Sequence, residues 1–305
     1  MPKKSIRQNP LRLADIAHAQ DMVVSRPQLA SAGYDSDATR QRVASGGWGQ
    51  VGNAFVLHSG IPTGNQLQWA AVLTAPGLVA ITARTAAERY GLRGFAPTAI
   101  DVLVARGDGP PLRIDGVRWH ESRRFAERDV ALGFSPPIVS RGRAIMDAAA
   151  WTRQPRVACA LMAASVQQRI VPASALRREL AAAGAVRHSR ILRSILADIE
   201  GGADSLAEID FVRISRKAGL PPPIRQSIRF DSSGKRRYLD VDFGTFAVEV
   251  DGGLHLRAQN YWDDARRQNE LVLGGDRILR FPSVAIRLDE DVVIAQLRRA
   301  HQMFG

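Results

Sequence analysis

Four acidic residues lie on two neighbouring apolar runs near the C-terminus, between residues 236 and 251. Asp240 and Asp242 share one face of the first predicted strand, and Glu249 and Asp251 share one face of the second. Carboxylates gathered on adjacent strands repel one another and raise one another's pKa, unless a divalent cation joins them. Mg²⁺ prefers a few carboxylates, water and a phosphate oxygen, and it can activate a water against a phosphodiester. The pattern therefore predicts Mg²⁺- or Mn²⁺-dependent phosphodiester hydrolysis.

The elements that must position these residues follow a helix–strand–strand–strand–helix–strand–helix order. Alternation of apolar and polar residues predicts the strands, and apolar spacing of three or four predicts the helices. Gly201-Gly202 marks the start of this domain, which we place at residues 203–305. The expected elements are a helix from 205, strands 224–230, 236–243 and 246–251, a helix 258–273, a strand 276–281 and a helix 290–303.

Several runs in this domain resemble the PD-(D/E)XK nucleases, and within them the small Vsr-like endonuclease domains. The matching runs are RRYLD at 236–240, VEVDGGLH at 248–255, WDDARRQNEL at 262–271 and DRILRF at 276–281. The resemblance implies an α/β restriction-endonuclease-like fold for the C-terminal domain.

The resemblance also implies roles for the acidic residues. Asp240 matches the metal-binding aspartate that ends the second strand, and Glu249 matches the second acidic metal ligand. Glu208 matches the acidic residue of the first helix. Only eight residues separate Asp240 from Glu249, so Asp242 is an alternative ligand to Asp240.

Four further residues receive catalytic or contact roles by the same resemblance. Asp251 stands where the wider superfamily has a lysine, as it does in the subfamily. His255 matches a histidine that orients or deprotonates the attacking water. Arg267 and Gln268 are expected to face the scissile phosphate or to brace the acidic cluster.

The first 60 residues predict a second kind of DNA contact. A short helix near residues 11–17, a helix start at Val23–Leu29 with Ser25 as its N-cap, a helix over Asp37–Ser45 and a Gly-rich ribbon give the outline of a winged helix. The second helix of such a motif enters the major groove. The side chains expected to contact DNA are Arg26, Gln28, Thr39, Arg40, Gln41 and Arg42. A small helical subdomain with a solvated polar face is the alternative.

The run from Val24 to Leu57 resembles the N-terminal winged helix of the AbiEi family of type IV antitoxins. The α/β region at 61–200 is similar to proteins in which an AbiEi-like part precedes a nuclease-like domain. A toxin or another defence-system protein is therefore an expected partner besides DNA. His18, His58, His120 and His188 lack metal-ligand spacing and are expected to be structural or surface residues.

Charge and composition agree with a nucleic-acid partner. The net charge is +12, and residues 1–204 carry 26 Lys and Arg against 16 Asp and Glu, a net +10. The single cysteine, Cys159, excludes an internal disulfide and fits a reducing cytoplasm, where we expect the protein. The sequence shows neither a secretory signal nor a run apolar enough for a membrane helix, so no membrane partner is expected.

Two other functions remain open at this point. A non-catalytic DNA-binding regulator of the type IV antitoxin kind would carry a degenerate nuclease fold. An RNA or tRNA nuclease would use the same acidic residues, because both polymers share the scissile linkage.

Overall fold

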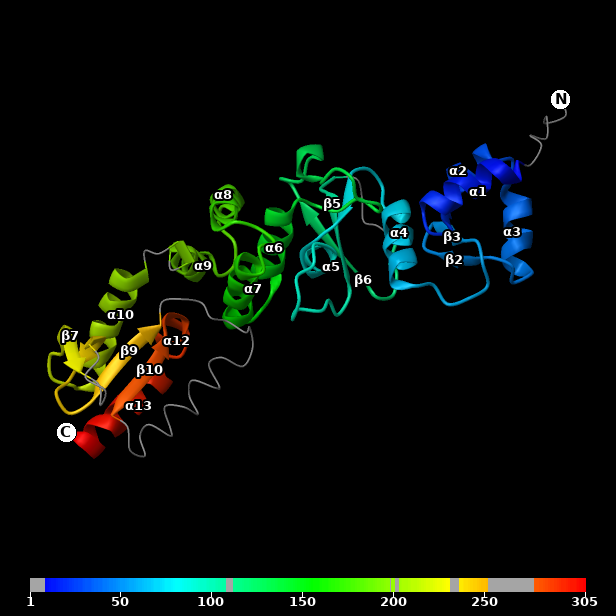
Figure 1. Ribbon diagram of the computed structural model, residues 1–305. Helices are drawn as coiled ribbons and strands as arrows, with labels where there is room; N and C mark the ends of the chain where they lie inside the picture. Colours follow the sequence, from blue (N-terminus) through cyan, green and yellow to red (C-terminus); the bar gives the residue numbers. More distant parts are fainter. Residues whose placement is uncertain (1–8, 108–111, 198, 201–202, 231–235, 252–276) are drawn as a thin grey trace, which may run out of the picture. The chain divides into compact units, whose positions relative to one another are not determined.

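The described residues form a mixed α/β structure with three small sheets in the computed structural model (Figure 1). The structure describes residues 9–107, 112–197, 199–200, 203–230, 236–251 and 277–305, and describes no side chains for 203–209, 225–230, 236–240, 251 and 282–284. Two compact units make up the chain, Met1–Asp147 and Ala148–Gly305.

Unit 1 begins with three helices around a small antiparallel sheet of strand order β1-β3-β2. Val24, Leu29, Tyr34 and Phe55 pack with the apolar face of α1 in one core cluster. The elements are α1 (Pro10–Ala19), β1 (Val23–Ser25), α2 (Arg26–Ser31), α3 (Ser36–Ala44), β2 (Gly49–Val51) and β3 (Ala54–Val56).

Local capping explains where these helices begin. The Ser25 hydroxyl accepts the Gln28 backbone N–H and the Gln28 side chain accepts the Ser25 N–H, so the predicted Ser25 cap is confirmed. Asp35 caps α3 in the same way, with its carboxylate accepting two backbone N–H groups. Val23–Ser25, predicted as part of the helix start, instead forms β1, because Val23 and Val24 pair with β3 and are fully buried.

The β2–β3 turn is fixed against the next helix, α4 (Gly64–Thr74). Gly52 has φ +57, and a Cβ there would lie 2.5 Å from the Thr74 hydroxyl oxygen. Only glycine fits this close approach and this backbone conformation. The Asn53 N–H donates to the same hydroxyl at 2.9 Å, which ties the ribbon to α4.

The rest of unit 1 is a three-stranded sheet of order β4-β5-β6, in which β5 and β6 are parallel. Its strands and helices follow one another along residues 79–151. They are β4 (Val79–Ile81), α5 (Ala83–Arg89), β5 (Ile100–Ala105), β6 (Val117–Ser122), the 3₁₀ turn η1 (Glu127–Asp129) and α6 (Arg141–Trp151), which ends in unit 2.

Unit 2 opens with three helices, α7 (Pro155–Gln167), α8 (Ala173–Ala183) and α9 (Ser189–Ala197). The helix α9 contacts both α7 and α8. Leu192, Ile195 and Leu196 are buried on one face of α9, while Arg190 and Arg193 on its other face are exposed.

The second part of unit 2 is a four-stranded mixed sheet of order β10-β9-β8-β7 (Figure 1). β7, β8 and β9 are antiparallel neighbours, and β9 and β10 are parallel. Its elements are α10 (Ala203–Ala218), β7 (Ile224–Phe230), β8 (Arg236–Asp242), β9 (Ala247–Asp251), β10 (Ile278–Pro282), α12 (Ser283–Leu288) and α13 (Glu290–Phe304).

Apolar residues from strands and helices form one core in this part. Phe211 and Ile214 of α10, Val248 of β9, Phe281 of β10 and Leu297 of α13 are all fully buried in it. The expected strands are confirmed to within two residues at each end. The expected helix 258–273 lies outside the described residues, and α12 is an additional short helix that the sequence did not indicate.

Candidate functional site

The register of β8 and β9 brings two of the expected acidic residues to neighbouring positions. Val241 pairs with Val248 in the antiparallel ladder, and both side chains are fully buried. Asp240 precedes Val241 on β8, and Glu249 follows Val248 on β9. The backbone positions of Asp240 and Glu249 are therefore next along the same ladder.

Glu249 has a cationic neighbour on the next strand. The parallel register sets Arg280 of β10 beside Glu249, and the guanidinium Nε lies 2.8 Å from a carboxylate oxygen. The Glu249 side chain is about one-fifth exposed and Arg280 is more open. Arg280 therefore balances the charge of this carboxylate, and a metal ion at Glu249 would compete with it.

Asp242, the alternative ligand, is already hydrogen-bonded within the turn that follows β8. Its side chain is buried, and its carboxylate accepts the Gly244 backbone N–H at 2.8 Å. Gly244 has φ +84 in the tight turn between β8 and β9. The carboxylate thus stabilises that turn.

The other C-terminal candidates are placed only in part. Glu208 lies on α10 and Asp251 is the last residue of β9, but their side chains are not described. His255, Arg267 and Gln268 lie outside the described residues.

At the N-terminus, α3 exposes three of its four expected contact residues. Arg40, Gln41 and Arg42 are exposed, and Arg42 lies over the Trp48 ring at 5.9 Å. Thr39 is a correction to the expected set. It is only 2% exposed and its hydroxyl donates to the Asp35 carbonyl, because residue 39 is on the side of α3 that faces the core.

The two expected contacts at α2 differ in their surroundings. Arg26 is exposed and lies 5.2 Å from the centre of the Phe55 ring, an arrangement that holds the guanidinium at the surface. The amide oxygen of Gln28 accepts the Ser25 backbone N–H and completes the N-terminal cap of α2. This side chain is half-buried, and its acceptor oxygen is already hydrogen-bonded within the helix start.

Sequence reasoning missed a buried polar network in unit 1. The Arg143 Nε donates to both carboxylate oxygens of Asp147, at 2.8 and 2.9 Å, and the two side chains are 4% and 7% exposed. The Thr82 hydroxyl donates to the same carboxylate at 2.8 Å. Burial raises the pKa of the Asp147 carboxyl, while Arg143 and Thr82 act in the opposite direction. The i,i+4 spacing of Arg143 and Asp147 on α6 was the available signal.

His120 belongs to a neighbouring ion cluster in the same unit. Its Nε2 lies 2.9 Å from a carboxylate oxygen of Asp101, and Arg118 contacts the same oxygen at 3.2 Å. Asp101 is 5% exposed, so Arg118 balances a nearly buried charge and the His120 ring adds a hydrogen bond to it. The expectation of a structural histidine agrees with this placement.

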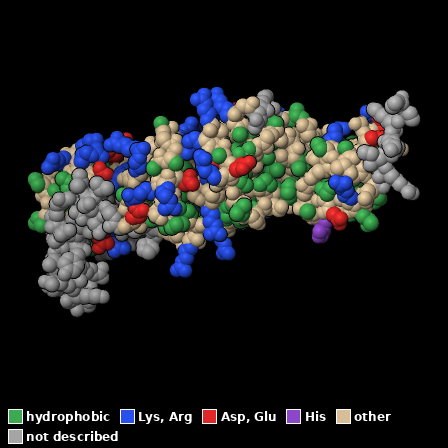
Figure 2. All heavy atoms as spheres, turned by 90° about the horizontal axis from the view of Figure 1, so that it is seen from above, with side chains coloured by type: hydrophobic (Ala, Val, Ile, Leu, Met, Phe, Trp, Pro, Cys, Tyr) green, Lys and Arg blue, Asp and Glu red, His purple; other side chains and the backbone are tan. Residues whose placement is uncertain are grey.

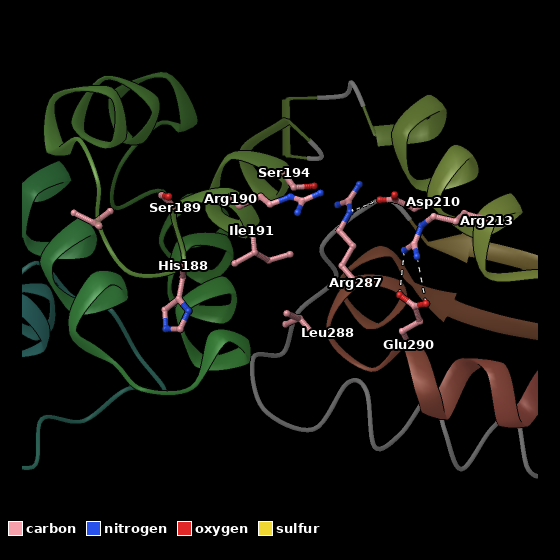
Figure 3. Close-up of a pocket in the computed structure, with 11 residues that line it drawn as sticks. His188, Ser189, Arg190, Ile191, Ser194, Asp210, Arg213, Arg287, Leu288 and Glu290 are labelled. Atoms are coloured by element: carbon pink, nitrogen blue, oxygen red, sulfur yellow. Dashed lines mark hydrogen bonds and ion pairs between the residues drawn. The ribbon is translucent and has the colours of Figure 1, made fainter. Parts of the chain in front are cut away.

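A pocket of about 900 Å³ opens in unit 2 between α9 and the helices α10, α12 and α13 (Figure 3). Two carboxylates in its wall are paired with cations. The Arg213 guanidinium contacts both oxygens of Glu290, and the Arg287 Nε lies 2.9 Å from Asp210. Lys217 also donates to Glu290, at 2.5 Å, and hydrogen bonds from Lys217 and Arg213 lower the pKa of the Glu290 carboxyl. Its other lining residues are Val186, His188, Ser189, Arg190, Ile191, Ser194 and Leu288.

Neither a protein-family model nor a curated protein matches this chain. Among the described residues, no three His, Cys, Asp or Glu side chains gather as metal ligands. None of the described helices is both long and apolar enough to cross a membrane.

Proposed function

We propose that the protein binds DNA and hydrolyses phosphodiester bonds at the acidic strands of unit 2, with Mg²⁺ or Mn²⁺ as cofactor. The observation that carries the proposal is the β8–β9 register, which sets Asp240 and Glu249 at adjacent ladder positions. Two carboxylates on rigid neighbouring strands are suited to a hard divalent cation.

The arrangement around these strands supports a restriction-endonuclease-like fold of the Vsr-like kind. A helix, three antiparallel strands and a fourth strand parallel to the third follow one another in unit 2. Parallel neighbours need a crossover connection, and residues 252–277 supply a chain long enough for one. The described elements support the order that the sequence resemblance implies.

Each acidic or histidine residue has its own role in the proposed chemistry. Asp240 and Glu249 would hold the metal ion, which supplies a polarised water and stabilises charge on the phosphate. His255 and Asp251 orient the water and take its proton, and Glu208 assists from α10. This division follows the resemblance, and Asp242 is left out because its carboxylate binds the turn at Gly244.

The remaining residues of the proposal contact DNA. Arg267 and Gln268 would face the scissile phosphate. At the other end of the chain, the α1-β1-α2-α3-β2-β3 order with sheet order β1-β3-β2 supports a winged helix. Arg40, Gln41 and Arg42 of α3 then enter the major groove, with Arg26 on the backbone. A toxin or other defence-system protein is a further proposed partner, by similarity to the AbiEi antitoxins.

One observation favours a second candidate, a non-catalytic DNA-binding regulator with a degenerate nuclease fold. Arg280 already neutralises Glu249 at 2.8 Å, so the acidic strands are partly compensated without a metal ion. A regulator would bind DNA with the same winged helix but would cleave nothing.

Nicking of supercoiled plasmid tests the proposal. The purified chain is incubated with Mg²⁺, Mn²⁺ or EDTA, beside Asp240→Ala, Glu249→Ala and the control Asp291→Asn, which removes an exposed charge of α13. The enzyme nicks with metal, and both alanine variants lose nicking while the control keeps it. Nicking that survives in both alanine variants, or that never appears with any metal, contradicts the proposal.

A further inference from the structure

The pocket of unit 2 brings two guanidinium groups to face each other. Figure 3 shows Arg190 extending from α9 toward Arg287 of α12, with Asp210 beyond it. Arg287 is bound through its Nε to Asp210, whereas Arg190 makes no hydrogen bond or ion pair with any residue that the structure describes. Two like charges on opposite walls of a cavity repel each other, and an anion between them removes that repulsion.

The charges of the other lining residues do not supply that anion. Glu290 is held by Arg213 and Lys217, and Asp210 by Arg287. Carboxylates paired in this way hold their cations in position. Because both carboxylates of the wall are paired, the positive charge of Arg190 is left in excess.

The exposed face of α9 extends this positive charge beyond the pocket. Arg193 follows Arg190 on the same side of the helix, and Arg187 lies just before α9. All three are exposed, and neither Arg187 nor Arg193 has a partner in the described part of the chain. Residues 148–200 contain eight arginines and only three acidic residues. Figure 2 shows Lys and Arg side chains gathering over the stretch that contains α8 and α9.

A row of arginines that leads into a pocket of about 900 Å³ suits a chain of phosphates better than a single small anion. Arginine forms bidentate hydrogen bonds to phosphate oxygens, and a clustered basic stripe is the electrostatic signature of nucleic-acid backbone binding. The hydroxyls of Ser189 and Ser194 in the same wall add neutral phosphate donors.

We propose that α9 and the adjoining pocket form a nucleic-acid backbone site, in which Arg190 and Arg193 contact successive phosphates opposite Arg213 and Arg287. The choice of DNA as the polymer rests on the proposed function. This site lies outside both the winged helix and the acidic strands, and it holds DNA on the unit that carries the acidic strands.

Salt-dependent binding of a labelled duplex to the full chain tests this site. The variant Arg190→Ala with Arg193→Ala removes two phosphate contacts. Its slope of log K against log salt becomes shallower by about 1.8, and its affinity falls roughly 30-fold at about 0.15 M salt. The matched control Arg106→Ala with Arg128→Ala removes two exposed arginines of unit 1 and keeps the wild-type slope. Because all four side chains are exposed, unfolding midpoints stay unchanged.

The outcomes separate this site from the proposed nuclease. An unchanged slope in the α9 variant overturns the site, even if plasmid nicking proceeds normally. A reduced slope in a protein that nicks nothing supports the site and contradicts the nuclease. If inorganic phosphate raises the unfolding midpoint of the wild type but not of the α9 variant, and duplex binding is equal in both, the pocket serves a free anion and the proposal fails.

Discussion

Replacing Asp147 by alanine tests the buried ion pair that joins α6 to the sheet of unit 1. The substitution leaves the Arg143 guanidinium charged at 4% exposure, with only the longer 3.7 Å contact to the Asp129 carboxylate as an ion pair. It also removes the acceptor of the fully buried Thr82 hydroxyl. Breaking a buried pair by deleting one partner costs about 3–5 kcal/mol. For a unit of this size, each kcal/mol lowers the unfolding midpoint by roughly 2–4 °C, so a loss of about 6–20 °C is expected.

The assay is chemical denaturation followed by circular dichroism, with thermal unfolding as a second measure. The matched control is Asp115→Ala, which removes a fully exposed carboxylate and is expected to change nothing measurable. A second variant, Arg143→Met with Asp147→Leu, removes both charges at once. It is expected to recover most of the lost stability, because an apolar pair of similar volume avoids the desolvation penalty.

The stabilising role of this ion pair is refuted if Asp147→Ala lowers the free energy of unfolding by less than about 1 kcal/mol. It is also refuted if the double variant is as unstable as the single one. In that case the packing of α6, and not the charge balance of Arg143, would decide the stability of unit 1.

Three further predictions concern single side chains. Glu290→Gln reduces stability at neutral pH, because the lowered pKa of Glu290 beside Lys217 adds stability above the ordinary glutamate pKa. That difference from wild type disappears as the pH falls below about 4, and a constant difference in denaturant midpoint across pH contradicts it. Ser25→Ala costs about 1 kcal/mol in the same assay, since α2 loses its cap; a neutral result shows that the cap is dispensable. Arg280→Gln removes the cation at Glu249, so half-maximal nicking occurs at lower Mg²⁺ than in wild type; a shift to higher Mg²⁺ refutes the competition.

Local signals explain why much of the fold could be predicted from sequence. Ser25 and Asp35 mark two helix starts through hydrogen bonds within three residues, and alternation in Phe246–Asp251 identifies β9. The three residues of β1 carry no such local signal. They are strand because Val23 and Val24 are buried against β3, which is about thirty residues further along the chain.

The candidate sites likewise contain features that the sequence could predict and features that it could not. Acidic alternation indicated Asp240 and Glu249 as neighbours. The two residues lie next to the Val241–Val248 pair on β8 and β9, and their role as a metal site stays a prediction. The burial of Thr39 depends on which side of α3 faces the core, and the spacing of Thr39 and Val43 was the signal that was overlooked. The pocket beside Arg190 could not be predicted, because it forms only when α9 packs near helices that follow it in the chain.

DNA binding and plasmid nicking, measured on the same sample of Asp240→Ala, test the proposed nuclease most directly. The variant is expected to bind a duplex with wild-type affinity, because the winged helix and the α9 site remain intact, and to lose Mg²⁺-dependent nicking. If wild-type protein binds the duplex but nicks plasmid with neither Mg²⁺ nor Mn²⁺, the acidic strands do not hydrolyse DNA and the chain is a DNA-binding regulator.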